Sequence, residues 1–423
     1  MPRVGVIRRA FACLLLFVGT AGAQDNPHLK NGSGEGPAGD TKSEAAIPTE
    51  KAGSTVIGVK SEVSAYADTD AVSVFTPAIE GSIKDPISGW SANGTYLVDI
   101  VSAASVDIVS TASGHWTEVR QAGTLSGTYK PSTIGFTASG AVSREPDYLS
   151  LSGGGAVALE LVQKTANPTL SYTYTSDTAG RAGTPFSVYS QPLVRHTVTG
   201  ALELILDPLT LLSFSADGIF ESGDQTKPYR FIPIFRPADV PSIPRGASVD
   251  FVNAKRLPGR VNEHTPLTRN RFAVSGRVAQ RLSGSTLILS ERFYMDDWGL
   301  KASTTDLRFV ADVGRRLFLW VHLRGHFQGG VSFWKRAYAA EFDDPLAPGR
   351  YVVPTWRTGD REEGPLSAAT FGGGARWNIG PASRMTSWSF VPQADMFTTL
   401  FNDALFVQTR TGYLGVLQLE AEF

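Results

Sequence analysis

The C-terminal segment from Tyr413 to Phe423 has the pattern that most constrains the fold of this chain. Side chains of an extended strand alternate between its two faces, so residues two positions apart share a face. One face here is apolar and carries Tyr413, Gly415, Leu417, Leu419, Ala421 and Phe423. The opposite face is mostly polar and carries Leu414, Val416, Gln418, Glu420 and Glu422. Such a strand needs an apolar medium or core along one whole side.

The same alternation recurs in strand-length segments from Ser54 onward, which predicts an all-β chain. In the segment 212–221, the apolar residues are Leu212, Phe214, Ala216 and Phe220. They alternate with Ser213, Ser215, Asp217 and Glu221. Many segments reach the roughly 9–11 residues that a β-strand needs to cross a bilayer. The alternative, a soluble β-sandwich or β-solenoid, would have strands averaging about 5–6 residues.

The connections between these segments alternate in length, as in transmembrane barrels with short turns at one end and long loops at the other. Short turns are expected near Asp85–Ser88, Lys130–Ser132, Thr165–Pro168, Asp207–Pro208, Ser283–Gly284, Gly314–Arg316 and Gly380–Ser383. Longer connections are expected near 102–118, 177–190, 222–269 and 336–366. We therefore predict a transmembrane antiparallel up-and-down β-barrel of about 16 strands. The segments 54–66 and 119–129 have the weakest pattern, and loss of one hairpin would leave 14 strands.

The N-terminal region predicts export. Residues 1–23 resemble a signal peptide, with arginines, then the apolar run from Phe11 to Val18, then a cleavage site at Ala21-Gly22-Ala23. The single cysteine, Cys13, lies within it, so no disulfide is expected in the mature protein. Residues 24–53 have no periodicity and predict a disordered periplasmic tail. The barrel is assigned to 54–423.

Net charge and mean hydropathy say little about the function of the chain. The formal net charge of −1 gives no attraction to nucleic acid, and no nucleic-acid partner is predicted. The mean hydropathy of −0.07 is that of a soluble protein. A transmembrane barrel has similar averages, because its strands alternate lipid-facing and lumen-facing residues.

Three blocks between Tyr66 and Ser150 resemble an uncharacterised family of bacterial outer-membrane barrels, domain of unknown function 3570. The matching residues are Tyr66, Asp68, Asp70, Pro77, Asp99, Ser102, Ser105, Glu145, Asp147 and Tyr148. Ala103 stands where the family usually has glycine. The last strand also resembles those of outer-membrane barrels, whose final aromatic residue the barrel-assembly machinery reads. That assembly signal would comprise Tyr413, Leu417, Leu419 and Phe423.

These resemblances imply a bacterial outer-membrane protein and no particular substrate. The partners they imply are outer-membrane lipid and lipopolysaccharide, the barrel-assembly machinery and periplasmic chaperones. A homo-oligomer is expected by analogy, because porins of this strand number are often trimers. The acids of the blocks could bind Ca²⁺, with Asp68 and Asp70 as candidate ligands. The alternative is solvated loops, or acids paired with Arg120 and Arg144; no other metal and no cofactor is predicted.

Basic residues share the polar faces of neighbouring strands in the C-terminal half and predict a basic lumen wall. They are Arg271, Arg277, Arg281, Arg292, Arg308, His322, Arg324 and His326. One interpretation is a pathway attractive to anions. The other is a network that stiffens the barrel and is neutralised by Asp296, Asp306 and Asp312. His322 and His326 lie about 13 Å apart along a strand, too far for one zinc.

No catalytic constellation is marked. Serines and His115, His196, His322 and His326 are available, but no spacing pairs them. The triplets Gly153–Gly155 and Gly372–Gly374 lack the residues of a phosphate loop and are interpreted as points of barrel curvature.

The first functional expectation is a porin-like passive channel for small solutes, with anions as a specific case. The alternatives are a closed barrel acting through its external loops and, third, an outer-membrane hydrolase. The loops at 222–269 and 336–366 are long enough to fold inward and narrow the lumen.

Overall fold

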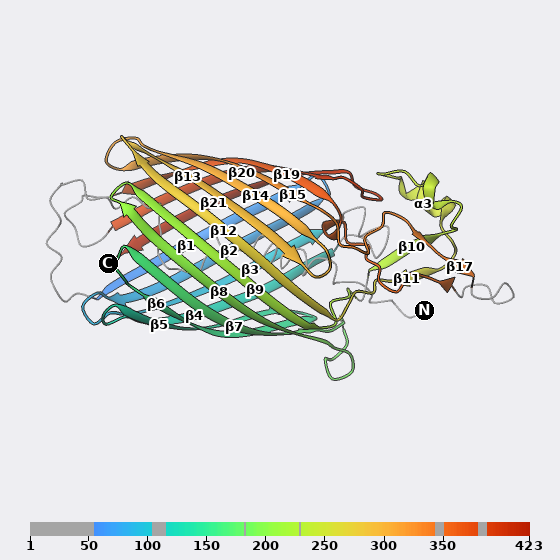
Figure 1. Cartoon of the computed structure of the whole chain (residues 1–423), viewed down its shortest axis with the longest axis horizontal. Coiled ribbons are helices and arrows are strands. Elements are labelled where there is room, and N and C mark those ends of the chain that lie inside the picture. The colour runs from blue at the N-terminus through green and yellow to red at the C-terminus, as the bar shows by residue number, and fades with distance from the viewer. Residues whose placement is uncertain (1–54, 104–115, 182, 228–229, 343–350, 380–386) are drawn as a thin grey trace.

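The computed structural model describes residues 55–103, 116–181, 183–227, 230–342, 351–379 and 387–423. Several predictions from sequence lie outside the described residues: the signal peptide, the tail, Ser105, His115 and the turn at Gly380–Ser383. Within the described part, 16 antiparallel strands close into a barrel (Figure 1). The predicted fold class and strand number are therefore confirmed.

Each barrel strand pairs with its neighbours in the chain, which makes the topology up-and-down. The first half contains β1 (Val56–Asp68), β2 (Val72–Asp85), β3 (Trp90–Ala103), β4 (Trp116–Tyr129), β5 (Ile134–Glu145), β6 (Tyr148–Leu159), β7 (Ala166–Ala179) and β8 (Gln191–Asp207). The second half contains β9 (Thr210–Gly223), β12 (Thr268–Leu282), β13 (Ser285–Asp296), β14 (Lys301–Asp312), β15 (Leu317–Gln328), β19 (Leu366–Ile379), β20 (Ser387–Phe401) and β21 (Thr409–Glu422). Pairing of β1 with β21 closes the barrel. Both weakly patterned segments, 54–66 and 119–129, form strands.

The alternating pattern separates the two faces of the barrel wall as predicted. In the last strand, Tyr413 is 56% exposed and Leu417 is 53% exposed, whereas the alternate residue Val416 is 1% exposed. Large apolar side chains are exposed on the outer face along the other strands too, among them Phe75, Leu125, Phe136, Leu170, Phe214, Phe272, Phe293 and Leu323. An apolar exterior that continues around a closed barrel is the surface that lipid, and not water, solvates favourably.

No helix in the part of the chain that the structure describes is long and apolar enough to span a membrane.

The described turns at the end that holds the C-terminus are short. One prediction is displaced: β6 and β7 are joined by 160–165, not by Thr165–Pro168. The turn is made by Val162, Gln163 and Lys164, which adopt positive φ angles. Pro168 lies near the start of β7, a position where a strand tolerates proline. The presence of Pro168 therefore led to a predicted turn that overlaps the first residues of β7.

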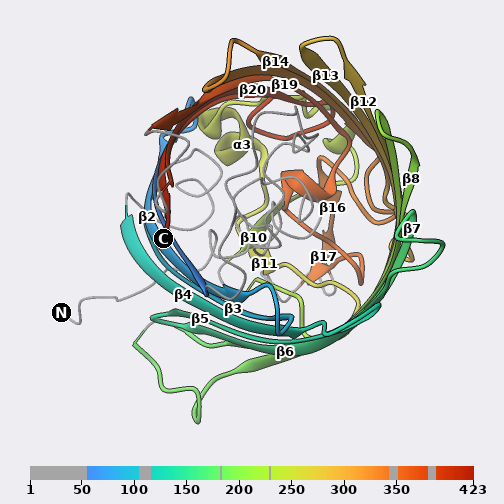
Figure 2. The ribbon, with the colours of Figure 1, turned by 90° about the vertical axis from the view of Figure 1, so that its left-hand side faces the viewer.

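The two longest connections, 224–267 and 329–365, fold together at the other end, and we call their described residues the cap. The cap contains the sheet of β10 (Phe231–Phe235), β11 (Arg260–Asn262) and β16 (Tyr338–Ala339). It also contains the pair β17 (Glu341–Phe342) and β18 (Tyr351–Val352), the helix α3 (Val249–Lys255), and the short helices η1 (Val240–Ser242) and η2 (Arg361–Glu363). Figure 1 shows the cap beyond the end of the barrel opposite the C-terminus, and Figure 2 shows that it lies across the opening.

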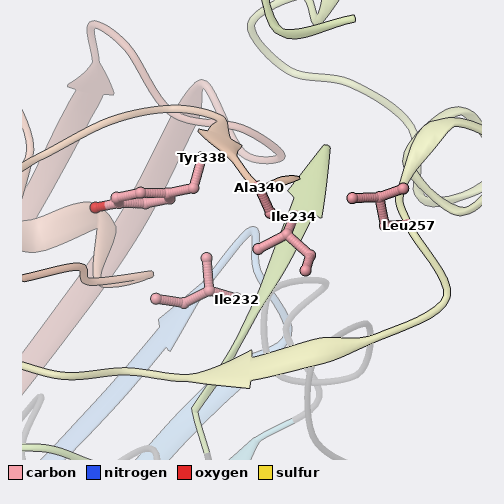
Figure 3. Close-up of a cluster of buried hydrophobic side chains, with 5 residues drawn as sticks. All are labelled: Ile232, Ile234, Leu257, Tyr338 and Ala340. Atoms are coloured by element: carbon pink, nitrogen blue, oxygen red, sulfur yellow. The ribbon is translucent and has the colours of Figure 1, made fainter. Parts of the chain in front are cut away.

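The cap has its own hydrophobic core, which explains why two loops distant in sequence fold as one unit. Ile232 and Ile234 of β10 pack with Tyr338, Ala340 and Leu257 (Figure 3). A second cluster joins Phe235, Ile243, Ala247, Val252 and Ala337. Full burial of one such large aliphatic side chain contributes about 1.5–3 kcal/mol, so the two clusters together can hold the connections in place.

Candidate functional site

The basic residues predicted to line the lumen do lie on inward faces, and most are paired with acids. Arg271 contacts Glu221 at 2.7 Å, and Arg292 lies 3.8 Å from Asp217. Arg281 pairs with Asp312, one of the acids expected to neutralise this wall. These pairs favour the neutralised network over a continuous basic wall.

Arg277 and Arg308 differ from the rest of the set. Both lie on inward-facing positions near the middles of β12 and β14, and neither has a hydrogen bond or ion pair among the described residues. Arg324 is cross-strand neighbour to Asp306 on β14. The lumen wall at mid-height therefore offers guanidinium groups that could interact with a passing solute.

The two histidines of β15 have separate partners, so they do not form one site. His322 Nε2 lies 2.7 Å from Asp395 Oδ1, and its Nδ1 lies 3.5 Å from Asp306. His326 Nδ1 lies 2.8 Å from the Thr304 hydroxyl. Both side chains belong to the polar lumen wall. His196, in contrast, is exposed on the outer face beside Tyr172, 2.8 Å from its hydroxyl.

A row of buried ion pairs follows the wall near the capped end. Arg195 of β8 bridges Asp177 of β7 at 3.2 Å and Glu221 of β9 at 2.9 Å. Glu221 also contacts Arg271 of β12, so one chain of charges crosses four adjacent strands. Buried charges in this arrangement fix the relative positions of their strands, because removal of one partner leaves another charge uncompensated.

The segment Asp360–Glu363 joins the cap to three parts of the barrel rim. Arg361 contacts Asp70 at 2.7 Å, in the connection between β1 and β2. Glu362 contacts Arg410 of β21 at 3.0 Å, and Glu363 contacts Arg269 of β12 at 2.8 Å. Since β12 and β21 lie six strands apart around the barrel, the ion pairs of this segment reach well-separated parts of the wall.

Asp360 fixes the same segment to the body of the cap. Its carboxylate contacts Lys227 and Arg230, each at 2.5 Å. Burial raises the pKa of Asp360, but the charges of Arg230 and Lys227 outweigh it and hold the pKa well below the usual range. Nearby, burial raises the pKa of Tyr338 to about 12, and its hydroxyl donates to the backbone oxygen of Thr358 at 3.1 Å.

Sequence reasoning missed these anchoring residues, Arg269, Arg361, Glu362, Glu363 and Arg410 among them. The signal that could have found them is a run of four consecutive charged residues, 360–363, within a long connection. Their partners on β12 and β21 are distant in sequence and could not be assigned without the fold.

The acids of the family-like blocks have two different environments. Asp68 accepts hydrogen bonds from the Tyr66 hydroxyl at 2.5 Å and from the backbone N–H groups of Asp70 and Val72. With Asp70 paired to Arg361, the two candidate calcium ligands serve a turn and the cap anchor. Asp99 pairs with Arg120 at 2.8 Å, one of the alternatives stated from sequence.

The other block acids converge with a residue that the sequence did not single out. Glu145 and Asp147 lie with Glu118 in a group in which one carboxylate oxygen of each residue lies within 4.8 Å of the others. All three residues are buried. The remaining described residues of these blocks lie in barrel strands: Pro77 in β2, Ser102 in β3 and Tyr148 at the start of β6.

The predicted assembly signal is exposed on the outer face of β21 and just after it. Leu419 is 44% exposed and Phe423 is 49% exposed, like Tyr413 and Leu417 on the same face. The Phe423 ring lies 6.0 Å from that of Trp388 on β20. These side chains are therefore presented on the outside of the barrel at the end of the chain.

Comparison with solved structures finds bacterial barrels of low similarity. Pseudomonas aeruginosa OccK7 (OpdD) is 8% identical with a TM-score of 0.42, covering 88% of this chain and 98% of that one. Acinetobacter baumannii OccAB1 is 10% identical with a TM-score of 0.37, covering 90% and 99%. The siderophore receptor PirA from Acinetobacter baumannii is 10% identical with a TM-score of 0.38; 81% of this chain is covered, which spans about half, 52%, of the receptor. At these values the likeness carries no functional argument.

No curated protein matches the sequence. A protein family matches residues 101–379, about two thirds of the chain, and its description is "Protein of unknown function (DUF3570)". Glu145, Asp147 and Tyr148 fall within the matched residues, whereas Tyr66, Asp68, Asp70, Pro77 and Asp99 precede them. The matched range contains most of the barrel and all of the cap, and the chain belongs to this family, DUF3570.

Proposed function

We propose that this protein resides in the bacterial outer membrane and provides a passive route for small solutes through its lumen, with access controlled by the cap. The outer membrane is the bilayer that accommodates a single-chain barrel with an even number of strands and an apolar exterior. A barrel of 16 strands is wide enough to leave an aqueous channel. The cap then covers the extracellular mouth.

The observation that carries the proposal is the polar, charged inner wall with Arg277 and Arg308 unpaired among the described residues. A solid barrel would fill its interior with interlocking side chains and would hold its inward-facing arginines in ion pairs, whereas Arg277 has none among the described residues and Arg308 acts on Asp306 only through its charge. These two groups, with Arg324, favour anionic solutes over cationic ones of the same size.

The cap also favours a second candidate function, in which the barrel is closed and binds a partner through its external surface. The observation that favours it is the attachment of the cap to the barrel rim by ion pairs from Arg361, Glu362 and Glu363. On its surface, Trp356 is 39% exposed and stacks on His264, with 4.8 Å between ring centroids.

Single-channel conductance of the refolded protein in a planar bilayer tests the proposal. A variant that lacks the cap provides the comparison. It can be made because the two ends of each long connection are already adjacent. Gly223 N–H donates to Leu267 O at 2.8 Å, and Gln328 pairs with Leu366. Short turns can therefore replace 224–266 and 329–365.

The channel proposal expects stepwise conductance that is small in the intact protein and larger in the capless variant. Both proteins must first show the heat-sensitive gel mobility of a folded barrel. Absence of conductance from both folded proteins would overturn the channel and leave the binding role through the cap.

A further inference from the structure

Three carboxylates from two strands and a turn converge near the capped end of the wall. Glu118 lies on β4, Glu145 is the last residue of β5, and Asp147 occupies the two-residue connection to β6. Glu118 and Glu145 face inward, since their neighbours Val119 and Arg144 are exposed on the outer face. Strand pairing brings the start of β4 beside the end of β5, which places Glu118 against the turn.

The convergence brings three buried carboxylates close together. The three carboxylates are 5%, 5% and 2% exposed, and one oxygen of each lies within 4.8 Å of the others. Asp99 lies on the neighbouring strand, and its carboxylate accepts from Thr76 and pairs with Arg120. Arg120 acts electrostatically on Glu145 as well, so one guanidinium group is shared between Asp99 and the cluster, and like charges held this close in a buried place repel strongly.

An independent observation points to a ligand at the same place. The Glu145 Oε2 atom is buried and has no hydrogen-bond partner. Buried carboxylate oxygens are nearly always paired, because loss of hydration costs free energy that a partner must return. A bound cation would supply that partner.

We propose that Glu118, Glu145 and Asp147 form a binding site for calcium in the lumen wall. All three donors are hard carboxylate oxygens, the ligands of Ca²⁺, whereas zinc sites use histidine and cysteine. Oxygens around Ca²⁺ at about 2.3–2.6 Å can lie up to about 5 Å apart, so three oxygens within 4.8 Å of one another can share one such ion. Mg²⁺ gives up its water shell reluctantly and is seldom bound by a cage of protein ligands alone. The ion would join β4 to the turn between β5 and β6.

Calorimetric titration of CaCl₂ into refolded, chelator-treated protein tests the site, and a dissociation constant on the order of 10⁻⁴ M is expected. Glu145→Gln and Asp147→Asn should each weaken calcium binding at least about tenfold, since each removes a charged ligand. Asp68→Asn is the matched control, because it removes an acid near the same end and should leave the affinity unchanged. Heat-sensitive gel mobility shows that each variant is folded.

A second measurement detects metal binding without relying on the heat of binding. Terbium occupies calcium sites and is excited through nearby tyrosine, and Tyr148 follows Asp147 in the chain. Terbium luminescence that calcium displaces in the wild type, and that is lost in Glu145→Gln, would support the site. Absence of calcium binding at millimolar concentration, equal binding by Glu145→Gln, or tighter binding of Mg²⁺ than of Ca²⁺ would each overturn the proposal.

Discussion

His322 on β15 and Asp395 on β20 form a 2.7 Å hydrogen bond although a third strand, β19, lies between them. Gly372 makes this contact feasible, because it occupies the paired position between the two residues and has no side chain. A Cβ atom at Gly372 would overlap with both the Asp395 carboxylate and the His322 ring. The glycine triplet that the sequence suggested as a point of curvature therefore has a different role at Gly372: it gives room to a polar contact inside the lumen.

Substitution Gly372→Ala should break that contact and destabilise the barrel by about 1.5–3 kcal/mol, the range for hydrogen bonds to charged groups. Urea unfolding in lipid vesicles measures the loss. Gly200→Ala is the matched control, because a Cβ at Gly200 meets nothing within 4 Å and the same residue change should have little effect. Equal stability of the two variants would show that the His322–Asp395 contact contributes nothing.

Arg269→Ala should be among the most destabilising substitutions in the wall. The side chain is 1% exposed, donates to both Asp296 and Glu363, and stacks over Trp298 at 4.2 Å. Its removal leaves two buried acids uncompensated, which costs about 3–5 kcal/mol. Arg281→Ala is the comparison, since its pair with Asp312 is more exposed and should contribute less than about 1 kcal/mol. Similar unfolding midpoints for both variants would contradict this ranking.

The cap should loosen in acid. The pKa of Asp360 is lowered in the folded protein, because Arg230 and Lys227 outweigh the opposing effect of burial. A lowered acid pKa stabilises the fold above the unfolded pKa of about 4, and the stabilisation declines as pH falls from there toward the folded pKa. Protease cleavage within 224–267 should therefore increase below about pH 4.

Asp360→Asn provides the control for this pH dependence. The amide cannot ionise and removes the negative charge that Lys227 and Arg230 both contact, so cleavage should already be faster at neutral pH. Its further rise in acid should be smaller than that of the wild type. Acid sensitivity of equal size in both proteins would assign the effect to other carboxylates.

Reversal of the lumen charge should change ion preference. The double variant Arg277→Glu and Arg324→Glu alters the net lumen charge by four units, and in a salt gradient the reversal potential should shift toward cation selectivity. Arg144→Glu is the control, because Arg144 is exposed on the outer face. An unchanged reversal potential in a conducting double variant would exclude a role for these arginines in selectivity.

The sequence by itself determined the barrel. Alternation such as that from Tyr413 to Phe423 is local, since each strand carries its own record of which face meets lipid and which meets the lumen. Register follows from that record, because a shift by one residue would reverse both faces. The strand number and the inward placement of Arg271, Arg277, Arg281 and His322 could therefore be predicted without any tertiary contact.

Only the tertiary structure decided which side chains meet. The pair Arg269–Glu363 joins residues 94 positions apart in the chain, and Glu118 of β4 meets Asp147 in the turn that follows the neighbouring strand β5. Such contacts depend on how two irregular connections fold into a cap and on which strand ends adjoin, and neither leaves a periodic signal. Every barrel strand follows the same alternation, because every strand has one face toward the bilayer. The cap anchors and the carboxylate cluster are single long-range contacts, and their geometry exists only after the barrel has closed.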